Sequence, residues 1–230
     1  MKIKISEFIE GAKQARVLAV IIDVFRAFSV ECYASDSGAI KIIATGKVSS
    51  AFELKNNYRK AVLAGERDER KIEGFDFGNS PTEILKADLS GKTLIHTTTA
   101  GTNGLVSAEN AEAIISGSFV NAEAVARYIR ATGIKQVSLV AMGYRAREST
   151  DEDLLCAEYI KSLLDGKEED FEKRISDLRF TSGKRFFEPG NIDFSPPTDF
   201  FLCTMRNRFN FVLKAEKRSD GNIDMQKIEI

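Results

Sequence analysis

Short apolar runs alternate with amphipathic stretches through the first two thirds of the chain. The clearest run, Val17–Ile22, is continuously apolar and ends in Asp23, which is typical of a strand buried on both faces. Comparable runs recur at residues 40–44, 61–64, 93–97, 113–116 and 137–142. Helical patterns lie between them, at about 26–35, 48–59, 102–109 and 121–131. Strands that alternate with helices predict an α/β fold with three layers, α/β/α, around a largely parallel or mixed sheet.

The pattern changes after residue 150. Ser149–Glu152 fits a capping box that opens a helix, and a charged helical stretch is expected at about 168–178. Thr181–Thr198 holds three of the four prolines and is expected to be a loop. Residues 209–217 and 223–230 flank a turn and predict a C-terminal antiparallel hairpin. We therefore expect one α/β domain over 1–230, or two tightly joined halves at about 1–147 and 148–230.

Composition narrows the class of protein. Lys and Arg total 33 and Asp and Glu 34, a balance that argues against a partner such as nucleic acid or a membrane surface. Three scattered cysteines are too few for a disulfide framework or a thiolate zinc site. Neither a signal-peptide core nor a membrane-length apolar run is visible, so a cytoplasmic protein is expected. The single histidine, His96, removes mechanisms that need a histidine pair, and any metal should be a hard ion held by oxygen.

The carboxyl ends of strands are where ligands bind in open α/β sheets. Asp23 directly follows the first buried strand, where it could hold Mg²⁺, and Arg26 lies one helical turn further on, where it could grip an anion. The alternative is that Asp23 caps the following helix and pairs with Arg26. Glu66 and Arg67 repeat the combination of acid and arginine after the run at 61–64.

Two loops add candidate ligand-binding groups. Gly74–Pro81 is rich in turn residues and presents Asn79 and Ser80 just before a proline that is well placed to begin a helix. Thr97–Thr102 combines threonine hydroxyls with Gly101 at the predicted start of a helix, as an anion-binding turn would. It lacks the lysine of a P-loop, and a turn that is merely capped by its threonines is the alternative.

Glu152 and Asp153 lie at a predicted helix start, where the helix dipole alone favours acids. The sequence Asp151–Asp153 also spells the Asp-x-Asp of the aspartyl-phosphate phosphatases, but no hydrophobic strand precedes it, and we reject that mechanism. No cysteine has an arginine at the spacing that a cysteine phosphatase requires.

In this order, the segments resemble the 2-phosphosulfolactate phosphatase family, the magnesium-dependent phosphatases of coenzyme M biosynthesis. The resemblance runs from about residue 17 to about 160 and rests on Asp23–Ala27 with Ser29, Gly65–Arg67, Gly74–Pro81, Thr98–Thr102, and Glu152–Asp153 with Cys156–Ala157. The most specific piece is Gly74–Pro81. Phe28 and Ala100 depart from the family, which commonly has threonine and asparagine at these positions.

The resemblance implies hydrolysis of (R)-2-phospho-3-sulfolactate to 3-sulfolactate and phosphate, with Mg²⁺ as the cofactor. The residues expected to take part are Asp23, Arg26, Glu66 and Arg67 in catalysis; Asn79, Ser80, Thr98, Thr99, Gly101, Thr102 and Arg145 in binding the small anionic substrate; and Asp23, Glu66 and Asp153 in holding the metal. We expect the sheet to gather the metal ligands at one edge.

Several alternatives stay open. Without a histidine pair or a suitably placed cysteine, attack on phosphorus by metal-activated water is favoured, and covalent attack by Asp23 is the rival route. The substrate could instead be another small phosphorylated hydroxy acid or a phosphosugar, and the chain could be a non-catalytic module that binds anions. Nucleic acid and membrane are not expected as partners, and a homo-oligomer is left open.

Overall fold

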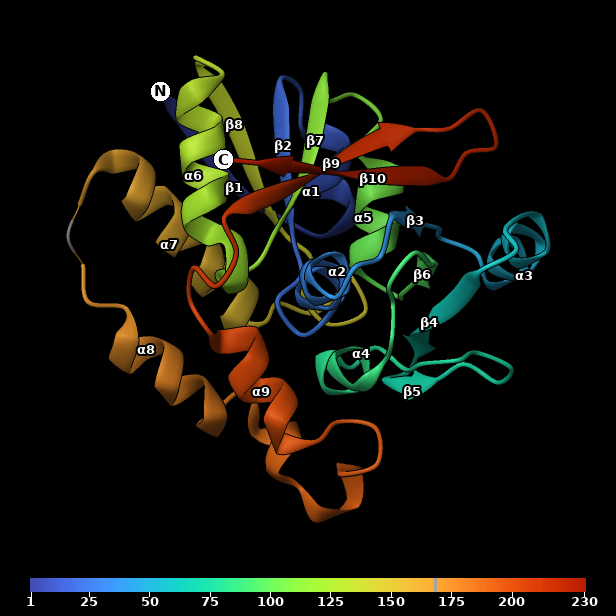
Figure 1. Ribbon diagram of the computed structural model, residues 1–230. Helices are drawn as coiled ribbons and strands as arrows, with labels where there is room; N and C mark the ends of the chain where they lie inside the picture. The colour runs from blue at the N-terminus through green and yellow to red at the C-terminus, as the bar shows by residue number, and fades with distance from the viewer. Residues whose placement is uncertain (168) are drawn as a thin grey trace.

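A computed structural model describes residues 1–167 and 169–230 (Figure 1). Its strands form one sheet in the order β1-β8-β2-β7-β9-β10-β3-β6-β4-β5. The strands are β1 (Lys2–Glu7), β2 (Leu18–Ile22), β3 (Lys41–Ala44), β4 (Ala61–Arg67), β5 (Arg70–Lys71), β6 (Thr93–Thr97), β7 (Ala113–Gly117), β8 (Gln136–Ala141), β9 (Phe211–Lys217) and β10 (Ile223–Glu229). The α-helices are α1 (Phe8–Gln14), α2 (Ala27–Asp36), α3 (Val48–Asn57), α4 (Pro81–Lys86), α5 (Gly101–Ser107), α6 (Ala122–Ala131), α7 (Asp151–Asp165), α8 (Glu172–Asp177) and α9 (Pro197–Thr204). The predicted α/β class is confirmed.

Strand β2 shows why the fold has three layers. All five of its residues are buried. Leu18, Val20 and Ile22 belong to the hydrophobic cluster that includes residues of α6 and α7. Ala19 and Ile21 belong to the cluster on the other face, which includes residues of α1, α2 and α5. Because successive side chains of a strand point to opposite faces, a continuous apolar run is what a strand covered on both sides requires.

The predicted C-terminal hairpin is present as β9 and β10, but it lies in the middle of the sheet, between two groups of parallel strands (Figure 1). One group contains β1, β8, β2 and β7, and the other contains β3, β6 and β4. Strand β7 is antiparallel to β9, and β10 is antiparallel to β3. Three antiparallel steps therefore separate the groups, which run in opposite directions. The two strands whose ends were expected to gather the metal ligands, β2 with Asp23 and β4 with Glu66, therefore belong to different groups.

The C-terminal third differs from the sequence prediction in detail. The expected loop at 181–198 contains two short 3₁₀ helices, η3 (Lys184–Phe187) and η4 (Pro189–Asn191), and the start of α9. The expected capping box is absent: the N-cap of α7 is Thr150, and its side chain makes no capping hydrogen bond. The helical stretch expected at 168–178 is observed as α8 followed by a 3₁₀ turn, and its first residue, 168, lies outside the described residues.

None of the helices in the two described ranges has both the length and the apolar character that crossing a bilayer requires. All three cysteines are buried and free of disulfides, in agreement with the absence of a disulfide framework.

Candidate active site

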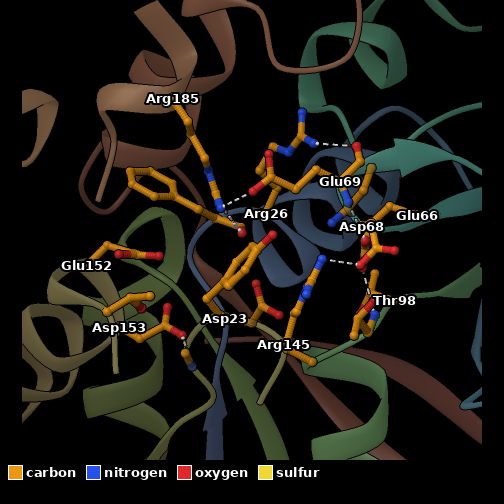
Figure 2. Close-up of a pocket in the computed structure, with 17 residues that line it drawn as sticks. Asp23, Arg26, Glu66, Asp68, Glu69, Thr98, Arg145, Glu152, Asp153 and Arg185 are labelled. Atoms are coloured by element: carbon orange, nitrogen blue, oxygen red, sulfur yellow. Dashed lines mark hydrogen bonds and ion pairs between the residues drawn. The ribbon is translucent and has the colours of Figure 1, made fainter. Parts of the chain in front are cut away.

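A pocket lies where the carboxyl ends of the two strand groups meet (Figure 2). It is lined by residues at the carboxyl ends of strands from both groups: Asp23 and Gly143 follow β2 and β8, Glu66 lies at the end of β4, and Thr98 follows β6. The residues that line the pocket are Asp23, Phe25, Arg26, Glu66, Asp68, Glu69, Asn79, Thr98, Thr99, Ala100, Gly143, Tyr144, Arg145, Thr150, Glu152, Asp153 and Arg185. The sequence prediction thus found pocket residues from both strand groups. It expected them to meet at one edge of the sheet, whereas they come from two groups of strands.

Asp23 lies at the centre of this pocket, directly after β2. Figure 2 shows it between Glu152 and Asp153 on one side and Glu66 on the other. Its Oδ1 accepts a hydrogen bond at 3.1 Å from the backbone N–H of Ala27, the first residue of α2, whose N-cap position is Arg26. Burial raises the pKa of Asp23 to about 6, and the nearby charges of Glu66 and Glu152 act in the same direction.

Arg26 lines the pocket, but its charge is already matched. Its Nη1 donates to Asp199 Oδ2 at 2.7 Å and to the carbonyl of Phe194 at 2.6 Å. Both side chains of this ion pair are buried. Asp199 lies in α9 and also accepts a hydrogen bond from Ser80 Oγ at 2.8 Å. The alternative in which Arg26 pairs with Asp23 is therefore wrong, because Asp199 takes that place.

Ser80 stabilises the start of α4 and does not face the pocket. Besides donating to Asp199, its Oγ accepts the backbone N–H of Glu83 and so caps α4. It does not line the pocket, whereas its neighbour Asn79 does.

Glu66 reaches the pocket from the end of β4. Its Oε1 accepts the backbone N–H of Thr99 at 2.7 Å and its Oε2 that of Glu69 at 2.9 Å. Gly65 permits this approach: its φ is +153°, and a Cβ there would lie 2.0 Å from the carbonyl oxygen of Thr97. The carboxylate is thus held by backbone amides from two strand ends.

Arg67, in contrast, is not brought to the pocket. Its guanidinium donates to the carbonyl of Glu66 at 2.6 Å and to Thr97 Oγ1 at 3.0 Å. Burial lowers the pKa of Arg67. The structure therefore separates the two members of the Glu66–Arg67 pair that the sequence prediction placed together.

Two of the three threonine hydroxyls in the turn at Thr98–Thr102 are used in hydrogen bonds within the turn. Thr98 and Thr102 exchange hydrogen bonds, with each backbone N–H donating to the other's Oγ1, at 2.9 and 3.2 Å. Thr98 and Thr99 line the pocket, and Gly101 and Thr102 do not. The Oγ1 of Thr99 is buried and has no hydrogen-bond partner among the described residues. It is a free polar atom where a ligand could bind.

Asp153 and Glu152 come from the first turn of α7. Asp153 accepts the backbone N–H of Val24 at 2.7 Å and that of Gly143 at 2.9 Å, so it joins the ends of β2 and β8. Burial, with the charges of Glu152 and Asp23, raises the pKa of Asp153 well above its usual range. Burial also raises the pKa of Glu152, whose Oε2 has no hydrogen-bond partner in the described part of the chain.

The loop after β8 carries Arg145 to the pocket rim. Gly143 has a φ of +64°, and a Cβ there would lie 2.2 Å from the carbonyl oxygen of Glu148, so this tight turn requires glycine. Arg145 forms an ion pair with Asp68 at 2.5 Å and lies over the ring of Tyr144. Both partners of the ion pair are partly exposed, which leaves the guanidinium accessible to a ligand.

Arg185 is the main pocket residue that the sequence prediction missed. It lies in η3, donates to Glu69 Oε1 at 2.7 Å and to the carbonyl of Phe25 at 3.1 Å, and points into the pocket in Figure 2. Its Nε is buried without a partner among residues 1–167 and 169–230. A signal existed: a solvated loop has little reason to carry two adjacent phenylalanines, Phe186 and Phe187.

The carboxylate oxygens of the pocket are the type of ligand that a hard cation such as Mg²⁺ prefers. Six carboxylates line the pocket, and four of them, those of Asp23, Glu66, Glu152 and Asp153, are buried. Within the described residues, however, no three or more His, Cys, Asp or Glu side chains are arranged so that they could hold a metal ion. The predicted metal ligands Asp23, Glu66 and Asp153 therefore share a pocket without forming such a group. Mg²⁺ commonly keeps several waters and needs only one or two carboxylates, which this donor set can supply.

Fold and site together define an α/β protein with an acidic pocket, edged by arginines, that suits a cation and an anionic ligand. The family model described as 2-phosphosulpholactate phosphatase matches residues 3–186. This chain belongs to that family. The matched range includes Arg185, beyond the residues that carried the resemblance in the sequence.

Individual relatives agree with the family match. A protein of Caldanaerobacter subterraneus subsp. tengcongensis is 42% identical over 160 residues, which is 67% of this chain and 66% of the relative. A Bacillus subtilis protein is 32% identical over 208 residues, 89% of this chain and 88% of the relative. A Clostridium perfringens protein is 38% identical over 163 residues, 69% and 65% of the two chains. All three carry the name "Probable 2-phosphosulfolactate phosphatase". The first and third alignments span just under two thirds of the relative.

Proposed function

We propose that this chain is a Mg²⁺-dependent phosphatase that hydrolyses (R)-2-phospho-3-sulfolactate to 3-sulfolactate and phosphate. Family membership and the names of the relatives support this activity. The observation that carries it is the composition of the pocket wall: six acids and three arginines among the described residues. A substrate with phosphate, carboxylate and sulfonate groups enters such a pocket only when a cation offsets the carboxylates. A cytoplasmic location is part of the proposal.

The cation side of the pocket consists of Asp23 with Glu66 and Glu152. The charges of Glu66 and Glu152 add to the burial that raises the pKa of Asp23, and a divalent ion would relieve this repulsion. Glu152 Oε2 has no protein partner among the described residues and is free to serve as a ligand. Glu66 and Asp153 each already accept two backbone amides, which orients them. Bound Mg²⁺ would supply positive charge to the phosphoryl oxygens.

The anion side consists of Arg185, Arg145 and the turn at Thr98–Thr99. The unpartnered Nε of Arg185 and Oγ1 of Thr99 are donors left available by the protein. Arg26 contributes less charge, because Asp199 neutralises it. We therefore assign Arg185 and Arg145 to the substrate's anionic groups, in place of Arg26 and Arg67.

Phosphate release tests the proposal. The substrates are 2-phosphosulfolactate, phospholactate and a phosphosugar, each assayed with Mg²⁺ and with EDTA. We expect turnover of the first, dependent on Mg²⁺, which is lost in Asp23→Asn and kept in Asp36→Asn, a change at an exposed acid at the end of α2. Turnover of another compound instead reassigns the substrate. Absence of turnover throughout, with anion binding retained, indicates a binding module.

The two chemical routes differ in whether Asp23 becomes phosphorylated. Acid quenching of the enzyme during turnover of radiolabelled substrate separates them. Label that stays on the protein, and is absent in Asp23→Asn, indicates covalent attack by Asp23, whereas unlabelled protein indicates attack by water.

A further inference from the structure

The only histidine of the chain lies in a buried polar chain that ends at the pocket wall. His96 on β6 and Glu31 on α2 are both completely buried, and His96 Nδ1 lies 2.9 Å from Glu31 Oε1. On the other side of the ring, His96 Nε2 lies 3.1 Å from Asn79 Oδ1. Asn79 lines the pocket, whereas His96 and Glu31 do not. The three side chains therefore connect the interior of the fold to the site.

The chemistry of the contacts gives this chain a direction. A carboxamide oxygen can only accept, so Nε2 of His96 must carry the hydrogen that it shares with Asn79 Oδ1. The Nδ2 group of Asn79 then points away from the ring. None of the hydrogen bonds formed within the described residues uses this Nδ2, so both its N–H groups are available to a ligand. The direction is the same whether Glu31 Oε1 or His96 Nδ1 holds the proton between them.

The backbone beside Asn79 is held by other contacts. The N–H of Gly78 donates to Glu83 Oε2 at 2.6 Å, and the N–H of Phe77 donates to the carbonyl of Leu63 at 3.0 Å. On the other side, Ser80 is tied to Asp199. The loop therefore does not need His96 for its course, and the contact with His96 acts on the carboxamide alone.

A merely structural role explains this arrangement poorly. Burying a histidine and a glutamate is costly, and apolar side chains of similar volume would pack the interior at lower cost. Glu31 Oε2 is moreover buried without a hydrogen-bond partner in the part of the chain that the structure describes. A buried polar network that holds its members rigidly can fix the orientation of a side chain at the pocket wall.

We infer that His96 and Glu31 are positioning residues, which hold the Asn79 carboxamide so that its N–H groups donate to an oxygen of the anionic substrate. This rests on the proposed function for the identity of the substrate, but the anion contact itself does not. His96 acts only through Asn79, because it is enclosed and does not reach the pocket.

Kinetics of four proteins test the inference: His96→Leu, His96→Gln, Asn79→Ala and the double variant His96→Leu/Asn79→Ala. Loss of the Asn79 donor should lower kcat/KM by about 10²-fold. His96→Leu should lower it by about tenfold or more, because the carboxamide is no longer oriented. Glutamine retains an N–H donor and should restore most of the activity. The double variant should be no worse than Asn79→Ala, since the histidine acts through the asparagine.

A structural role gives different results. In that case His96→Leu lowers the thermal midpoint, its kinetic effect adds to that of Asn79→Ala, and glutamine gives no rescue. Ser116→Ala, which removes a buried hydroxyl in β7 away from the pocket, controls for the loss of any buried polar group. Additive losses in kcat/KM would overturn the inference.

Nitrogen-15 NMR provides a readout that does not need turnover. In tag-free protein only one imidazole is present, so its signals need no assignment. We expect hydrogen on Nε2, and we expect inorganic phosphate with Mg²⁺ to shift the His96 signals in the wild type but not in Asn79→Ala. If this occurs without turnover of any substrate, the proposed function fails and the inference stands. If turnover occurs but Nε2 lacks hydrogen or ignores phosphate, the inference fails alone.

Discussion

Replacing Asp23 by asparagine should make the protein more stable while abolishing its activity. The change removes one negative charge and keeps the side chain's shape. Burial and neighbouring acids raise the pKa of Asp23 from 3.8 to about 6. At about 1.4 kcal/mol per pKa unit, ionised Asp23 destabilises the folded chain by up to about 3 kcal/mol. Asparagine keeps an acceptor for the N–H of Ala27, so we expect a net gain of about 1–3 kcal/mol.

The sign of the pH dependence follows from the raised pKa. A folded chain that binds the proton more tightly than the unfolded chain is stabilised by it below pH 3.8, and this stabilisation is lost as the pH rises through about 6. The advantage of Asp23→Asn should therefore be full at pH 8 and vanish near pH 4. Urea unfolding of both proteins at the two pH values, in EDTA, measures this difference.

Magnesium provides the second half of the test. An ion that binds only the folded state stabilises it by about 2.7 kcal/mol at a concentration one hundred times its Kd. Wild-type protein should gain stability from Mg²⁺, and Asp23→Asn should gain much less. The exposed Asp36→Asn should match the wild type in both respects. If Asp23→Asn is less stable than the wild type at pH 8 in EDTA, or if Mg²⁺ stabilises both equally, the reasoning about Asp23 is refuted.

Three arginines should respond differently to substitution. Arg26→Ala leaves Asp199 buried without its cation and should lower the free energy of unfolding by about 3–5 kcal/mol, measured by urea unfolding; an unchanged value would contradict the role of this ion pair. Arg67→Lys breaks contacts outside the pocket, so the thermal midpoint should fall while kcat/KM changes less than about threefold; the reverse would restore Arg67 to catalysis. Arg185→Lys should raise KM by about tenfold with little change in the midpoint, because lysine lacks the Nε and the planar fork, and equal KM values would remove Arg185 from substrate binding.

Local patterns predicted the elements of this fold better than their arrangement. The apolar run before Asp23 and the hairpin at residues 209–230 are properties of short segments, and both are present. That the hairpin lies between the two parallel groups depends on pairs such as Ile114 with Ala215 and Ile223 with Ala44. Those contacts join segments far apart in the chain, and edge and central strands share much of their hydrophobic pattern. The sequence pattern therefore could not predict that the two groups of parallel strands run in opposite directions.

The same division applies to the site. Position at or just after the end of a strand was enough to find Asp23, Glu66 and Thr99, which line the pocket. It did not show that only Glu66 of the Glu66–Arg67 pair faces the pocket. The two residues are consecutive in β4, and consecutive side chains of a strand point to opposite faces. Arg185 comes from a segment without a periodic pattern and reaches the pocket only through tertiary packing.

The proposed function places an anionic substrate in a pocket that is lined by acids, and this combination constrains how the site would work. Arg26 is neutralised by Asp199, so Arg145 and Arg185 are the arginines of the pocket wall that could serve an anion, and each already pairs with one acid. Fixed cations therefore do not balance the buried carboxylates. Directed N–H groups, such as those of Asn79, add recognition without adding charge. In the proposed function a bound Mg²⁺ offsets most of the remaining charge, so anion binding and Mg²⁺ binding should each strengthen the other, as linkage between the two ligands requires.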